Sequence, residues 1–160
     1  MVAIRRIAHV ETGPGVLHGA VGGAVAGTAM AMVEMVWAAA AGMIASVPLG
    51  AAPPEIGLST AIVAGLLTHM ALSMMFGIMF VLLIWVLPPL RASAVVTVVT
   101  ASAFGLALWL VNFYVIAPAL GREWFTAADK VQQFVAHTFA FGMVLGLYLV
   151  SMLDRPDHAV

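Results

Sequence analysis

The chain has little charge and no cysteine. Only 8% of its 160 residues are charged, and Lys and Arg together number six. Soluble domains carry about a quarter charged residues, and a nucleic-acid surface needs clustered Lys and Arg. The composition therefore excludes a soluble secreted domain, a disordered chain and a nucleic-acid binder. The absence of cysteine excludes disulfides, iron–sulfur clusters, thiolate zinc sites and cysteine nucleophiles.

Hydrophobic residues are abundant instead, at 64%. About 20 apolar residues cross a bilayer as a helix, and the long runs rich in Ala, Leu and Met are too long for strands. We expect one all-α transmembrane domain over 1–160, with short tails at 1–14 and 154–160. The predicted spans are 15–47, 57–87, 92–118 and 128–153.

Short connections between these spans predict an antiparallel, up-down four-helix bundle with both termini on one side. That side carries most of the basic residues, namely Arg5, Arg6, Arg91 and Arg155. The opposite side has Arg122 and Lys130. The positive-inside rule therefore places both termini in the cytoplasm and the protein in the cell (inner) membrane. The connection 121–130 is expected to be solvated.

The first two predicted spans are longer than the ~30 Å of bilayer hydrocarbon requires. Tilt, or a break near Gly42, would absorb the excess length. Small residues recur four apart along one face of several spans. Such faces let membrane helices approach closely, so we predict helix packing at Gly19, Gly23, Gly27, Gly65, Gly77, Gly142 and Gly146.

Three ionisable residues lie inside the predicted spans, and such residues are costly enough to suggest a site. At 1.5 Å per residue, Glu34, His69 and His137 all lie roughly 5 Å to the outer side of the midplane. Asn112 lies about 10 Å out. Three helices thus place a carboxyl and two imidazoles at one level, which predicts a shared polar site.

Several chemistries use this set of residues. A carboxylate and two imidazoles can hold iron, copper or zinc, and two facing imidazoles can be the axial ligands of a haem. Met75 and Met143 would add thioether ligands for copper, and Asn112 and Ser73 are supporting polar groups. The same groups can relay protons, or they can simply hydrogen-bond the helices together. The cofactor stays open.

The two halves of the chain show related patterns, which predicts an internal two-fold repeat of helix pairs. Glu34 follows Gly27 by seven residues, and Asn112 follows Gly105 by seven. The next span in each half carries one histidine, His69 or His137, with a methionine six residues further on.

Three functions fit these features. The first is a membrane protein that binds a metal, haem or proton at Glu34, His69 and His137. The second is a non-catalytic accessory or assembly subunit of a larger membrane complex. The third is a small homo-oligomeric channel or transporter. The partners are therefore the lipid bilayer and either another membrane protein or a second copy. No enzyme signature is visible, so catalysis is not expected.

Four segments carry a family resemblance: GAVGGAVAGTAMAMVE, THMALSMMFGIMF, LALWLVNFYVIAPALG and FVAHTFAFGMVLGLYL. With them the chain resembles the YagU-like four-span bacterial inner-membrane proteins and related families of unknown function, over roughly 19–150. The resemblance implies a shared role for His69, His137, Pro118 and Gly121. It implies no biochemical activity, and Glu34 has no match in it.

Overall fold

The computed structural model of the protein describes residues 12–34 and 39–153. These residues form helices and turns, and no strand occurs among them, which confirms the predicted all-helical class. Four helices are long and apolar enough to cross a membrane: Gly15–Glu34, Leu58–Val86, Ala94–Ala119 and Lys130–Met152. Most of the predicted tails, with Arg5, Arg6 and Arg155, lie outside the described residues.

The first apolar run does not form one helix. Helix α1 (Thr12–Glu34) ends at Glu34, and a separate helix α2 (Ala39–Leu49) follows. The single span expected over 15–47 is therefore wrong, and the break does not lie near Gly42, which is buried within α2 beside Pro53. At 11 residues, α2 is too short to cross a bilayer. The excess length is thus taken up by a second, short helix.

Prolines separate the next helices. The turn η1 (Pro53–Glu55) precedes α3 (Leu58–Val86), and the turn η2 (Pro88–Arg91) follows it. Pro88 and Pro89 have no backbone N–H to continue the helix. Helix α4 (Ala94–Val111) then begins at Ser93, whose side chain accepts a hydrogen bond from the Val96 N–H and caps the helix.

Both remaining spans contain a wide, π-helical stretch. Helix α4 continues through the π-helical η3 (Asn112–Ile116) into α5 (Ala117–Ala119). After the turn η4 (Glu123–Ala127), α6 (Lys130–Val135), the π-helical η5 (Ala136–Met143) and α7 (Val144–Leu153) form the last span. Such π-helical turns are frequent at functional sites, and here they contain Asn112 and His137.

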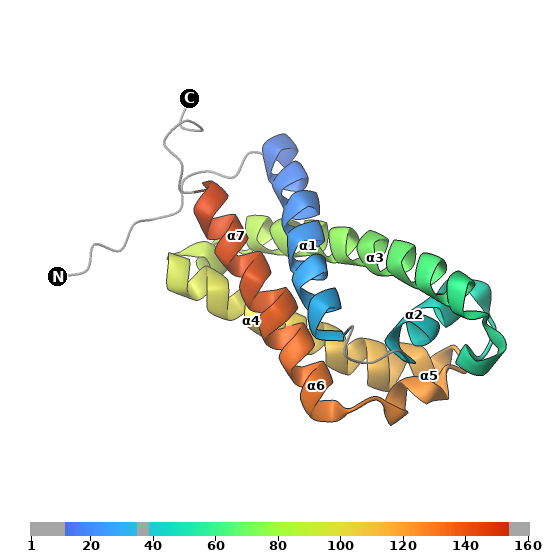
Figure 1. Cartoon of the computed structure of the whole chain (residues 1–160). Coiled ribbons are helices and arrows are strands. Elements are labelled where there is room, and N and C mark those ends of the chain that lie inside the picture. Colours follow the sequence, from blue (N-terminus) through green and yellow to red (C-terminus); the bar gives the residue numbers. More distant parts are fainter. Residues whose placement is uncertain (1–11, 35–38, 154–160) are drawn as a thin grey trace.

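The helices pack mainly as two pairs (Figure 1). Helix α1 crosses α3, and α2 also packs against α3. Helix α4 packs against η5 and α7. Contacts of α1 with η5 and α7 join the pairs. The start of α1 and the end of α7 lie at the same end of the molecule. The buried core between the pairs includes Met30, Phe80, Ile84, Phe141, Leu145 and Leu149.

Glycines make the helix crossings close. In the first pair, Gly19 lies against the backbone of Gly77, and Gly23 lies against that of Ser73. Gly27 faces the Ser73 side chain, and Gly65 faces the backbone of α2. In the second pair, Gly105, Gly142 and Gly146 make equivalent approaches between α4 and the last span. All seven glycines proposed as packing positions therefore lie at helix–helix contacts.

The outer surface of the bundle is apolar on every long helix. Exposed apolar side chains include Val21 on α1, Leu67 on α3, Val99 on α4 and Leu147 on α7. Soluble monomers rarely expose large apolar patches. An apolar surface of this extent suits a lipid environment.

The α1–α3 crossing predicts a sharp glycine requirement. A Cβ added to Gly77 would lie 2.1 Å from the Gly19 carbonyl oxygen, whereas a Cβ on Gly57 would meet nothing within 4 Å. We expect Gly77→Ala to lower the unfolding free energy by about 1–3 kcal/mol, as overpacked sites do. Gly57→Ala, the matched control, should leave it nearly unchanged. Thermal unfolding in detergent, followed by tryptophan fluorescence, measures both, and equal melting temperatures would contradict the close crossing.

Candidate functional site

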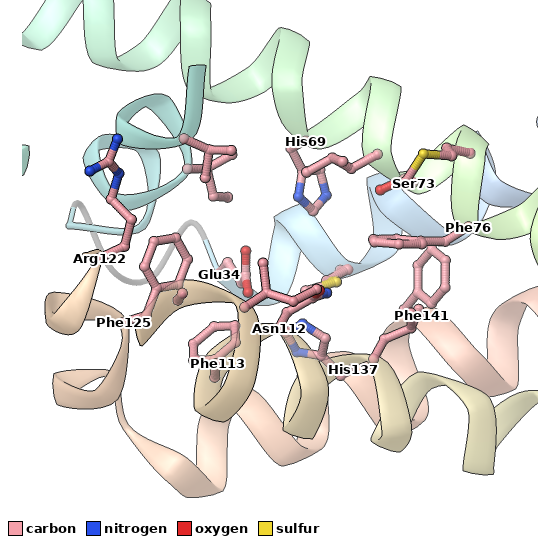
Figure 2. Close-up of a pocket in the computed structure, with 18 of the residues that line it drawn as sticks. Glu34, His69, Ser73, Phe76, Asn112, Phe113, Arg122, Phe125, His137 and Phe141 are labelled. Carbon is pink, nitrogen blue, oxygen red and sulfur yellow. The ribbon is translucent and has the colours of Figure 1, made fainter. Parts of the chain in front are cut away.

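A cavity of about 300 Å³ lies between the two helix pairs. It is bounded by α1, α2, α3, the α4–η3–α5 helix, η5 and the turn around Arg122. Its walls are chiefly apolar and aromatic, with Ile44, Leu72, Phe76, Leu108, Phe113 and Phe141 among them. Glu34, His69, Asn112 and His137 also line it, and Figure 2 shows them approaching one space from different helices. The three ionisable residues for which the sequence predicts a shared polar site therefore line one cavity.

His69 is held by the neighbouring helix. Its side chain is buried on α3, one turn before Ser73, and its Nε2 lies 2.8 Å from the carbonyl oxygen of Gly27 on α1. A carbonyl oxygen only accepts hydrogen bonds, so Nε2 carries the hydrogen and donates. The short distance is available because Gly27 and Gly23 let the two backbones approach. The orientation of His69 therefore depends on the α1–α3 crossing.

His137 is held by its own helix. It lies in the π-helical stretch η5, and its Nδ1 is 3.0 Å from the carbonyl oxygen of Gln133, one turn earlier. Its ring packs edge-on against Phe113, with 5.6 Å between ring centroids. Because the Gln133 carbonyl oxygen can only accept a hydrogen bond, His137 Nδ1 carries the hydrogen and donates it.

Glu34 is buried at the last position of α1. Its carboxyl has a side-chain hydrogen-bond partner in Gln133, which is buried on α6. The neighbouring Gln132 donates through Nε2 to the Val33 carbonyl oxygen at 3.3 Å. The two glutamines therefore join the end of α1 to the start of the last span.

The supporting residues divide into two groups. Asn112, Ser73 and Met75 line the cavity. Met143 does not line it in the described structure and has an exposed fraction of 36%. The lining therefore gives no support for the predicted contribution of Met143 to this cavity.

Glu34, His69 and His137 do not form a metal centre. Within 12–34 and 39–153, no three His, Asp or Glu side chains are placed to hold a metal ion. One nitrogen of each histidine is used by a backbone carbonyl, and Glu34 is paired with Gln133. These bonds hold the groups around the cavity rather than about a common point. Haem and proton binding stay untested predictions.

The connection 121–130, expected to be solvated, contributes to the site. Arg122 and Phe125 line the cavity, and Figure 2 shows them at the end near α2. Trp124 donates through Nε1 to Ser46 of α2 at 3.1 Å, while Arg122 lies over the Trp124 ring, 5.6 Å from its centroid. The connection is thus folded back onto α2 by its tryptophan.

Sequence reasoning also missed Gln133 and the aromatic wall. Gln133 precedes His137 by four residues, a spacing that puts both on one helix face. This spacing could have indicated that Gln133 lies beside His137 in the site. No comparable spacing points to Arg122 or Phe125.

A second hollow, of about 320 Å³, lies on the side of the site near α2. Its lining includes Ala31, Ala41, Ile62 and Leu66, and it shares Glu34, Ile44 and His69 with the first cavity. These three residues therefore lie at the boundary between the two spaces.

No family model matches the chain, and neither a curated protein nor a solved structure shows significant similarity to it. The resemblance to YagU-like proteins stays a prediction, and the function must be argued from the cavity itself.

The pairing of Glu34 with Gln133 is testable by a double-mutant cycle. Hydrogen bonds between membrane helices contribute about 0.6–1.7 kcal/mol. We expect a coupling of that size between Glu34→Leu and Gln133→Leu, from unfolding free energies measured by SDS titration. Glu34→Leu combined with Gln132→Leu is the control, because Gln132 bonds to a backbone carbonyl. A coupling near zero in the first cycle would show that the two side chains do not interact.

Proposed function

We propose that the protein binds a small lipophilic molecule with a polar head in the central cavity. The observation that carries this proposal is the lining: an apolar and aromatic cavity of about 300 Å³ with a few polar side chains, Glu34, His69, Asn112 and His137 among them. Ligand pockets typically combine apolar walls with a few polar groups that set orientation. The apolar part of the ligand would pack among Phe76, Phe113 and Phe141, and its head would meet His69 and His137.

The edge of the cavity supports entry from the bilayer. Val47, Met75, Ile116 and Leu120 line the cavity and have exposed fractions between 41% and 58%. Of these, Met75 and Ile116 lie on membrane-spanning helices, whose exposed apolar side chains face lipid tails. A lipophilic molecule would therefore reach the site sideways, from the hydrocarbon, without crossing an aqueous mouth.

The predicted internal repeat would place the cavity at the junction of two related halves. Met30 and Leu108, Glu34 and Asn112, and His69 and His137 occupy matching positions in the two halves, and all six line the cavity. Each half supplies one helix crossing, α1 with α3 and α4 with the last span. In membrane proteins built from repeats, ligand sites commonly lie at such junctions near the midplane.

The proposal is tested by identifying molecules that co-purify with the protein. Leu72 lines the cavity, whereas Leu67, on the same helix, is 66% exposed and lines neither hollow in the described structure. We expect Leu72→Trp to fill part of the cavity and to reduce co-purified lipophilic molecules at least about ten-fold, while Leu67→Trp retains them. Mass spectrometry of solvent extracts measures both, and equal extracts from the two variants would contradict the proposal.

The same samples discriminate the other functions. Thr68 precedes His69 on α3 and is in the lining of neither cavity as described, so Thr68→Ala is the control. Stoichiometric iron, copper or zinc that is lost in His69→Ala but kept in Thr68→Ala would favour a metal or haem site instead. A partner protein recovered equally from all variants, without a lipophilic molecule, would favour an accessory subunit. Flux through reconstituted oligomers that depends on Glu34 would favour a channel.

We also propose an antiparallel bundle in the inner membrane with cytoplasmic termini, as the positions of Arg91, Arg122 and Lys130 suggest. The cysteine-free sequence makes this directly testable. Ala92, in the connection after η2, and Ala127, in η4, are both exposed. In intact cells, a membrane-impermeant maleimide should label Ala127→Cys and not Ala92→Cys. The reverse pattern would invert the orientation.

A further inference from the structure

One nitrogen of each cavity histidine is left without a partner. His69 uses Nε2 for the Gly27 carbonyl, which leaves Nδ1, and His137 uses Nδ1 for the Gln133 carbonyl, which leaves Nε2. In the described part of the chain, neither remaining nitrogen has a hydrogen bond. Both rings line the cavity and are directed into it in Figure 2.

The hydrogen bonds already made determine what the remaining nitrogens can do. A neutral imidazole has one donor and one acceptor nitrogen. Since both donors are used by backbone carbonyls, both free nitrogens are acceptors. The neutral form is also the one that apolar walls accommodate at least cost. The cavity therefore presents two acceptors from opposite walls and no donor from either histidine.

We propose that the ligand's head carries hydrogen-bond donors, as in a phenol, a diol or an amine, and that it binds more tightly than the same head with its donor blocked. This rests on the proposed function and adds the chemical class of the head group. A phenol donates one hydrogen bond, to His69 Nδ1 or to His137 Nε2, and a diol or an amine can donate to both. A head that only accepts hydrogen bonds leaves both nitrogens unpaired. Sites built to hydrogen-bond a hydroxyl discriminate strongly against analogues that lack it.

The test compares a long-chain alkylphenol with its own O-methyl ether, which differs in losing the donor. Affinities are measured by titration calorimetry on the full chain in detergent micelles, with Leu72→Trp as the blank for partition into micelles. We expect the phenol to bind at least about five-fold more tightly than the ether, the equivalent of one hydrogen bond. His137→Phe keeps a ring in place but removes the acceptor, so it should reduce this preference, while Thr68→Ala should preserve it.

Each result separates this inference from the proposed function. Equal affinities for phenol and ether, both lost in Leu72→Trp, would leave the cavity as a lipophilic site and overturn the donor requirement. Tighter binding of the ether would also overturn it. If neither compound binds above the blank, both proposals fail. A preference for the phenol in the unmodified protein supports the inference even if a histidine variant does not fold.

Discussion

The close crossing of α1 and α3 is the contact on which the rest of the structure depends. Membrane helices gain little from the hydrophobic effect when they associate, so shape and a few hydrogen bonds must hold them. Here glycine backbones meet at Gly19 and Gly77, and the short separation lets His69 reach a carbonyl 42 residues away in sequence. A larger residue at the crossing would part the helices, release the imidazole and change the wall of the cavity.

Irregular helix geometry accompanies two of the other polar groups around the same cavity. The two π-helical stretches contain Asn112 and His137. A regular helix uses its backbone groups internally, whereas a wide turn alters that pattern and reorients side chains. Two of the polar residues of the lining thus lie where regular helical hydrogen bonding is interrupted. The regular helical stretches beside them pack closely against each other, α4 against α7, and this packing fixes where the two π-helical stretches lie.

The sequence predicted much of this architecture, and its failures have physical causes. Run length and composition indicated four membrane-length helices, and residue depth indicated that Glu34, His69 and His137 share a level. The break after Glu34 was missed because no Gly or Pro stands between Glu34 and Ala39. Helix rotation and side-chain tautomers depend on packing, so depth alone suggested a metal-ligand set that the geometry does not form. The inward fold of Arg122 and Phe125 involves long-range contacts, from Trp124 to Ser46 and from Phe125 to Phe113, that local sequence patterns do not indicate.

The cavity has an exposed apolar edge, formed by Val47, Met75, Ile116 and Leu120. If the ligand enters there, its concentration in the lipid, rather than in water, sets the occupancy of the cavity. A site reached from the hydrocarbon meets its ligand at the concentration that dissolves in lipid, and apolar molecules partition strongly out of water. A bond that is weak on an aqueous scale is then sufficient for high occupancy. Exchange with the bilayer can also be rapid, so the fraction of protein with bound ligand would follow the ligand concentration in the membrane. Occupancy would report how much of the compound the surrounding membrane contains.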